Sequence, residues 1–284
     1  MNQAEQVVKA ELFRAMHSGP PLLLLPNAWD GISARLIVEA GFPAIATTSG
    51  GLAWALGYPD GEKVPWSEVV AATARIARVV ATPVTADIEA GYGATPDAVA
   101  RSIGDIIGAG AVGVNLEDGL HPAEVEPGRP PIRSLDDAAS RIRAAREAAT
   151  AAGVPIVINA RTDLYIKNIG DPDSRFDEAV RRGRAYLAAG ADCFYPIALR
   201  DPATIGRLVT ALGAPVNINV RAGLPSVAEL EALGVARAST ATAMTLMAMG
   251  FVRQLAERLR ATRRFDALDP ALTHAEAQRL FADG

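Results

Sequence analysis

The sequence predicts an α/β protein of the (β/α)8 TIM-barrel class. Short apolar segments that end in polar residues alternate with alanine-rich segments of helical periodicity, and eight such pairs follow one another along the chain. Strict alternation requires a parallel sheet covered by helices, and a count of eight favours closure into a barrel. An open doubly wound sheet is the alternative, and it is disfavoured because no Gly-x-Gly-x-x-Gly turn follows the first strand.

The boundaries of the elements follow from this alternation. The expected strands are residues 22–27, 44–49, 83–88, 113–118, 156–162, 191–196, 215–220 and 236–241. The expected helices are residues 31–40, 67–80, 96–109, 135–152, 175–189, 202–212, 226–233 and 242–260, with extra N- and C-terminal helices at 3–17 and 270–282. Gly41, Gly110, Gly153 and Gly190 each follow a helix, where glycine adopts the left-handed cap conformation.

The composition agrees with a single large core. The chain has 284 residues, 50% of them hydrophobic, without a linker or low-complexity segment, so residues 1–284 are expected to form one domain. The net charge of −4 argues against nucleic acid as a partner. Cys193 is the only cysteine, which excludes an intrachain disulfide. Neither a signal peptide nor a membrane-spanning segment is apparent, so a cytoplasmic protein is expected.

Acidic residues are concentrated where the third and fourth strands end. Asp87 and Glu89 are two residues apart and point to the same side of an extended chain, whereas only one of Glu117 and Asp118 can face inward. Barrel active sites lie at these strand ends. Converging carboxylates repel one another unless a cation binds between them. A site made of oxygen ligands alone favours Mg²⁺ or Mn²⁺ over zinc. A divalent metal site is therefore predicted, with helix capping or pairing to arginines as the alternative.

Candidate substrate ligands follow other strands. Arg161 ends the fifth strand and could bind a substrate carboxylate or a developing enolate oxygen; the alternative is a salt bridge to Asp163 or Glu117. The remaining candidates are polar or glycine residues at strand ends: Ser49, Gly50 and Gly51, expected in an anion-binding loop, together with Asn115 and Asn217. His121 follows the fourth strand and could reach the site. The sixth strand has no lysine, which argues against Schiff-base chemistry.

Several segments resemble the isocitrate lyase/phosphoenolpyruvate mutase superfamily. They include PNAWDG, TTSGG, ADIEAGYG, NLEDG and INARTD, in the order and at the spacing of that family. The resemblance implies a (β/α)8 barrel whose eighth helix is swapped between subunits of a homotetramer. It also implies Mg²⁺ and a small-molecule 2-oxo acid substrate or an enolate intermediate.

The resemblance also implies roles for individual residues. Asp87 would be the main metal ligand, and Asp60, Glu89 and Glu117 would hold metal-bound waters. Ser49, Gly50 and Gly51 would bind the substrate carboxylate, and Arg161 would stabilise the enolate.

One segment departs from the family pattern. Residues 119–134, GLHPAEVEPGRPPIRS, lack the cysteine and lysine of the tricarboxylate lyases and the gate of the mutase. The sequence therefore predicts a Mg²⁺-dependent carbon–carbon lyase of a small 2-oxo or 2-hydroxy dicarboxylate, similar to oxaloacetate decarboxylase. Tyr92, His121 or a metal-bound water could donate the proton. The alternatives are a P–C bond enzyme, a condensing enzyme and a catalytically idle barrel. Arg129 and Arg133 are expected to be solvated loop charges rather than substrate ligands.

Overall fold

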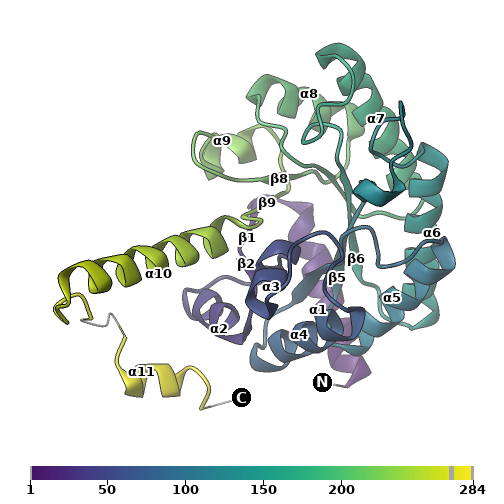
Figure 1. Cartoon of the computed structure of the whole chain (residues 1–284). Helices are drawn as coiled ribbons and strands as arrows, with labels where there is room; N and C mark the ends of the chain where they lie inside the picture. The colour runs from purple at the N-terminus through teal and green to yellow at the C-terminus, as the bar shows by residue number, and fades with distance from the viewer. Residues whose placement is uncertain (1, 269–271, 283–284) are drawn as a thin grey trace.

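The structure is a computed structural model that describes residues 2–268 and 272–282 of the chain. Parallel strands occupy its centre and helices surround them (Figure 1). The strands are β1 (Leu23–Leu25), β2 (Asn27–Ala28), β3 (Ile45–Thr47), β4 (Val84–Asp87), β5 (Gly113–Glu117), β6 (Val157–Thr162), β7 (Cys193–Pro196), β8 (Asn217–Asn219) and β9 (Arg237–Ser239).

The helices alternate with these strands as the sequence predicts. They are α1 (Gln3–Ala15), α2 (Gly31–Glu39), α3 (Ser49–Leu56), α4 (Trp66–Val79), α5 (Pro96–Gly108), α6 (Leu135–Ala151), α7 (Pro172–Ala188), α8 (Pro202–Leu212), α9 (Val227–Ala232), α10 (Ala243–Thr262) and α11 (His274–Arg279), with short 3₁₀ turns η1 (Met16–Ser18) and η2 (Pro122–Glu124). The predicted glycine caps are confirmed, because Gly41, Gly110, Gly153 and Gly190 all have φ between 68° and 110°.

The strands form two parallel ladders. One has the order β2-β3-β4-β5-β6-β7 and the other β1-β9-β8. The first predicted strand is split into β1 and β2 by Pro26, which has no N–H to donate to a ladder. On the other side, a parallel bridge between Phe194 and Val216 links the start of β7 to the residue before β8. The parallel α/β fold predicted from the alternation is confirmed.

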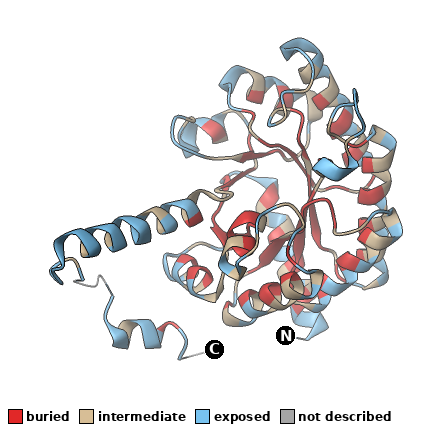
Figure 2. Cartoon of the chain, in the orientation of Figure 1, coloured by how far each residue is buried: buried red, intermediate tan, exposed pale blue. Residues whose placement is uncertain are grey.

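The central strands are buried on both faces, as expected for a parallel sheet covered by helices (Figure 2). The main core cluster includes residues of α1, and Phe13 of that helix is fully buried. Gln6 donates to the carbonyls of Ile107 and Ala111, and Arg14 forms an ion pair with Asp192. The helix α1 therefore packs beneath the strand segments that begin near residues 111 and 192, at the end opposite to the predicted site.

The helices α3, α10 and α11 need separate comparison with the expected elements. Residues 49–56 form the helix α3, where the sequence predicted a loop. The helix α10 projects from the rest of the chain and is largely exposed (Figures 1 and 2). The predicted helix 270–282 is represented by α11, and residues 270 and 271 lie outside the described part of the chain. No helix in the described ranges is long and apolar enough to cross a membrane.

Candidate active site

A cavity of about 190 Å³ lies at the carboxyl ends of the strands. It is small beside the roughly 300–1,000 Å³ of pockets that hold drug-sized ligands, so it suits a small metabolite. Four charged residues line it: Asp60, Asp87, Arg161 and Arg237. Its position agrees with the general location of active sites in proteins of this architecture.

Asp87, the last residue of β4, is held by hydrogen bonds on both carboxylate oxygens. The Asn115 side-chain amide donates to Oδ1 (3.1 Å), and the backbone N–H of Ser49 donates to Oδ2 (3.1 Å). Asn159 in turn donates to Asn115 Oδ1 (2.8 Å), which orients the Asn115 amide toward the carboxylate. A carboxylate has about four acceptor positions, so Asp87 is fixed in place and can still bind a cation.

Asp60 lines the cavity and lies close to the first turn of α3. Burial raises the pKa of Asp60, and the neighbouring Asp87 carboxylate raises it further. A Cβ atom on Gly50 would lie 3.0 Å from Asp60 Oδ2, and one on Gly51 would lie 2.6 Å from Thr245 Oγ1. Glycine at both positions therefore lets α3 approach the site. The mutual repulsion of the two aspartates favours a cation between them.

The residues Ser49, Gly50 and Gly51 were expected in an anion-binding loop, and that expectation of a loop is wrong. They form the first turn of α3, and the Ser49 N–H donates to Asp87. Ser49 lines the cavity, whereas Gly50 and Gly51 are buried behind it.

Arg161, in β6, lines the cavity and makes both of the salt bridges considered for it. Its Nη1 lies 2.6 Å from Glu117 Oε2, and its Nε donates to Asp163 Oδ1 (2.8 Å). Burial raises the pKa of Glu117, and the Arg161 guanidinium counteracts this. The positive charge of Arg161 is therefore already balanced by the Glu117 and Asp163 carboxylates. These two contacts also orient the remaining N–H groups of the guanidinium.

Glu89, Tyr92 and His121 form a second cluster around Glu62, next to the cavity lining. The Glu62 N–H donates to both Glu89 oxygens (2.9 Å each), and the Tyr92 hydroxyl donates to Glu89 Oε1 (3.2 Å). His121 Nε2 lies 3.1 Å from Glu62 Oε2. Burial raises the pKa of Glu89 to about 8. Glu62, Glu89 and Tyr92 all have φ of 51°, a conformation that non-glycine residues rarely adopt and that concentrates at functional sites.

Asn115 and Asn217, both predicted as substrate ligands, lie in different environments. Asn115 lines the cavity beside Asp87. Asn217 is fully buried, and its amide donates to Ser239 Oγ (3.1 Å). Asn217 is absent from the cavity lining, while its partner Ser239 belongs to it.

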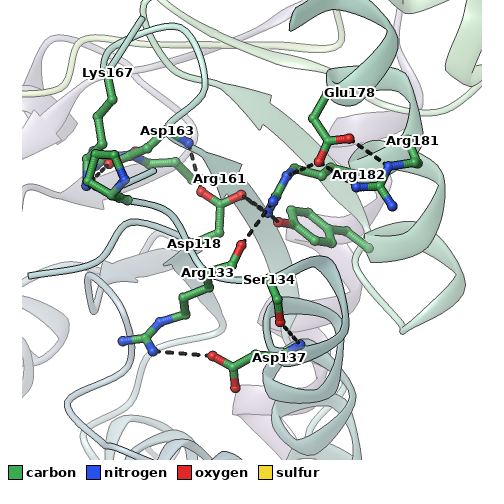
Figure 3. Close-up of polar contacts among 12 residues, drawn as sticks. Asp118, Arg133, Ser134, Asp137, Arg161, Asp163, Lys167, Glu178, Arg181 and Arg182 are labelled. Carbon is green, nitrogen blue, oxygen red and sulfur yellow. Dashed lines mark hydrogen bonds and ion pairs between the residues drawn. The ribbon is translucent and has the colours of Figure 1, made fainter. Parts of the chain in front are cut away.

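Asp118 is absent from the cavity lining and belongs to a buried network of polar side chains (Figure 3). It accepts hydrogen bonds from Tyr186 (2.5 Å) and Arg182 (3.1 Å), and its other oxygen accepts from the Asp163 N–H (2.8 Å). Arg182 also donates to the carbonyl of Arg133 (2.9 Å). Neither Glu117 nor Asp118 lines the cavity, and only the Glu117 side chain forms an ion pair with a residue that does, Arg161. Asp118 links the end of segment 119–134 to α7.

The two arginines of that segment differ in their surroundings. Arg129 is exposed and pairs with Glu126 (3.0 Å), in agreement with a solvated loop charge. Arg133 is buried and pairs with Glu124 (3.0 Å) and Asp137 (3.3 Å), so the expectation of a solvated charge is wrong for Arg133. Neither arginine lines the cavity.

Arg237 and Tyr195 line the cavity but were not among the predicted site residues. Tyr195 is part of a buried strand, and nothing in its sequence context marks it as polar-facing. Arg237 carried a usable signal, because it is the only charged residue within the strand segment 236–241.

A parallel α/β fold with carboxylates and arginines around a small cavity at the carboxyl ends of its strands is typical of α/β enzymes. Within this class the chain belongs to the phosphoenolpyruvate phosphomutase family, whose model matches residues 13–260. The predicted membership of the isocitrate lyase/phosphoenolpyruvate mutase superfamily is thereby confirmed.

Relatives in this superfamily carry out several reactions. The chain is 36% identical to a putative lyase/mutase from Burkholderia cenocepacia, with a TM-score of 0.88 over 99% of this chain and 98% of that one. It is 33% identical to an oxaloacetate decarboxylase from Chromohalobacter salexigens over 78% of this chain and 75% of the relative. It is 26% identical to a phosphonopyruvate hydrolase solved with oxalate and Mg²⁺, with a TM-score of 0.84 over 97% and 95% of the two chains. The superfamily thus includes carbon–carbon lyases and P–C bond enzymes.

Proposed function

We propose that the protein is a Mg²⁺-dependent carbon–carbon lyase that acts on a small 2-oxo or 2-hydroxy dicarboxylate, with oxaloacetate decarboxylation as the leading reaction. The observation that carries the proposal is the juxtaposition of Asp60, Asp87 and Arg161 in one small cavity. Two repelling carboxylates favour a divalent cation, and the arginine favours an anion beside it. The similarity to an oxaloacetate decarboxylase supports this choice of substrate.

The residues present fit Mg²⁺ better than a metal that requires many protein ligands. Within the described ranges, no group of three or more His, Cys, Asp or Glu side chains is arranged to hold a metal. Mg²⁺ is commonly bound through one or two carboxylates, with water and substrate completing its coordination. Asp87 would be the direct ligand. Asp60, Glu89 and Glu117 would act from outside the first coordination sphere.

The chemistry divides between the metal and the protein. When bound, Mg²⁺ would draw electron density toward the 2-oxo group as the bond to the departing carboxylate breaks. Arg161, held by Glu117 and Asp163, would direct its remaining N–H groups at the developing enolate oxygen. The first turn of α3, with Ser49 at the cavity wall, would orient the substrate carboxylate that adjoins the 2-oxo group.

The proton that completes the product would come from the cluster around Glu62. Tyr92 and His121 are both within this cluster, through Glu89 and Glu62. Of the two, we propose Tyr92 as the proton donor. Its hydroxyl donates to the Glu89 carboxylate, and Asp87 lies near enough to Glu89 to raise the pKa of that carboxyl. Neither side chain lines the cavity, so this role requires the cluster to move when substrate binds.

The test is pyruvate formation from oxaloacetate by the purified protein with Mg²⁺, with EDTA, and with Asp87→Ala. Asp97→Ala, an exposed acid in the first turn of α5, is the matched control. Turnover above the metal's own background that is lost with EDTA and with Asp87→Ala, but kept by Asp97→Ala, is expected. Turnover that persists in EDTA would contradict the proposal.

A P–C bond reaction is the second candidate, because a phosphonopyruvate hydrolase is among the structurally similar proteins. Phosphorus NMR on phosphonopyruvate separates it from the leading proposal. Release of inorganic phosphate or formation of phosphoenolpyruvate, with no decarboxylation of oxaloacetate, would replace the leading proposal with this one.

We also propose a closed single-domain barrel that forms a homotetramer through exchange of α10. The continuity of β1 and β2 and the Phe194–Val216 bridge support closure. The exposed apolar side chains Met247, Phe251 and Val252 on α10 support helix exchange, since such a surface is normally covered. Light scattering should show a tetramer that Met247→Lys/Phe251→Lys reduces to smaller species. A monomeric wild-type protein would refute the assembly.

A further inference from the structure

Arg237 is a buried arginine on the inner face of β9. Its side chain lines the cavity together with that of Ser239, two residues later on the same face. The residue is only 2% exposed, and its strand is paired on both sides, with Leu23 of β1 and Asn217 of β8. The guanidinium is therefore held inside the ring of strands and reaches the cavity that contains Asp87.

The guanidinium of Arg237 lacks the partners that other buried arginines have. Its Nε and Nη1 are buried and make no hydrogen bond within the described ranges. Arg141, by contrast, donates to Asp137 and to the carbonyls of Gly93 and Ala94. Arg182 likewise pairs with Asp118. A buried charge without a partner is costly, so such a residue is expected where it serves a ligand.

The charges around the cavity leave Arg237 uncompensated. Arg161 is balanced by Glu117 and Asp163. A divalent cation bound by Asp87, with Asp60 acting from outside its first coordination sphere, would balance the charges of these two aspartates. The charge of Arg237 would then remain without a counter-ion at the cavity wall. Guanidinium groups stay protonated and recognise carboxylates through paired N–H donors, so the complementary group is a second carboxylate.

We propose that Arg237 is a substrate-binding residue that takes the distal carboxylate of a four-carbon dicarboxylate. The proximal carboxylate and its 2-oxo or 2-hydroxy group would lie toward Asp87. This inference rests on the proposed function for the proximal end of the ligand. It adds the reason why the substrate carries two carboxylates. It also assigns a selectivity role to a residue that the metal site does not use.

The test is calorimetric binding of L-malate and L-2-hydroxybutyrate in the presence of Mg²⁺. The two acids share four carbons and the 2-hydroxy-carboxylate end, and they differ in a carboxylate or a methyl group at the other end. The wild type is expected to bind malate at least tenfold more tightly, since hydrogen bonds to charged groups account for such a factor. Arg237→Met should remove most of this preference and leave 2-hydroxybutyrate binding within about twofold.

Thermal unfolding without ligand or metal supplies a second readout. Arg237→Met replaces an unpartnered buried charge by an apolar chain of similar length, so its Tm should equal or exceed that of the wild type. Arg141→Met is the matched control, because it removes a buried arginine whose partners are all satisfied. It should lower the Tm and keep the malate preference. Arg237→Lys should retain an intermediate preference and provides the binding test if the methionine variant does not fold.

Two results would overturn the inference. One is a wild type that binds malate and 2-hydroxybutyrate equally. The other is an Arg237→Met variant that keeps the full malate preference. Failure of the proposed function is a separate outcome, because binding needs no turnover. A protein that does not decarboxylate oxaloacetate but loses its malate preference in Arg237→Met retains the inferred dicarboxylate site. If the Arg237→Met variant instead decarboxylates oxaloacetate with the KM of the wild type, the proposed function stands and the inferred dicarboxylate site is refuted.

Discussion

Acidification from pH 7 to pH 5 should destabilise the protein through His17. This residue of η1 is 4% exposed, and its Nδ1 lies 2.8 Å from the carbonyl of Phe13. Burial, reinforced by the charge of Arg237, lowers the pKa of His17 from 6.5 to about 3. Below pH 6.5 the unfolded chain therefore takes up a proton that the folded protein does not accept until about pH 3. Stability is complete above pH 6.5 and is lost as the pH falls through that window.

The size of the effect follows from the two pKa values. Between pH 7 and pH 5 the free energy of unfolding should fall by about 2 kcal/mol from this residue alone. For a chain of 284 residues, with an unfolding entropy of about 2.1 cal/mol/K per residue, this is a decrease in Tm of about 3 °C.

Urea and thermal unfolding at pH 7, 6 and 5 provide the assay, with His17→Phe as the variant. Carboxylates elsewhere titrate equally in both proteins, so the difference between wild type and variant isolates His17. The variant should lose about 2 kcal/mol less than the wild type over this range. His274→Gln, at an exposed position of α11, should behave like the wild type. The reasoning is refuted if His17→Phe shows the same pH dependence as the wild type.

Three further predictions concern the site and its surroundings. Arg161→Met should lower the free energy of unfolding by about 3–5 kcal/mol, measured by urea unfolding, because it leaves the buried Glu117 carboxylate unpaired; an added Glu117→Gln should recover part of the loss. Gly51→Ala should lower the free energy of unfolding by about 1–3 kcal/mol and reduce turnover, since its Cβ would lie 2.6 Å from neighbouring atoms. Gly104→Ala, with open space around it, should raise the free energy of unfolding by up to about 1 kcal/mol in the same assay. Cys193 should react with a thiol reagent only after unfolding, because burial raises its pKa to about 12; rapid labelling of the native protein would contradict this.

The sequence predicted the strands well because parallel strands buried on both faces must be apolar, and their polar last residues stand out. Asp87 and Arg161 were found in this way, at the ends of β4 and β6. The helix α3 was missed because its first turn contains Gly50 and Gly51, residues with low helix propensity. Contacts with Thr242 and Thr245, nearly two hundred residues away, are what require glycine there.

The remaining features of the site depend on contacts that no local pattern contains. The inward orientation of Arg237 follows from pairing of β9 with β1, whose residues come more than two hundred positions earlier. The rotation of Glu89 toward the Glu62 backbone depends on positive φ angles at both residues, which their residue types do not predict. The position of Asn217 outside the cavity lining likewise goes with a contact to another strand, its hydrogen bond to Ser239 of β9.

The packing of α1 has a consequence for synthesis of the chain on the ribosome. This helix is synthesised before its partners, which lie near residues 107–111, 155–156 and 192. At about 5–20 residues per second, Arg14 waits roughly 10–35 s before Asp192 has been added. A helix of 13 residues is marginal on its own in water, so Ala10 and Phe13 stay exposed throughout this interval. Binding of a chaperone to α1 during this interval would keep these apolar side chains from contacts with other chains.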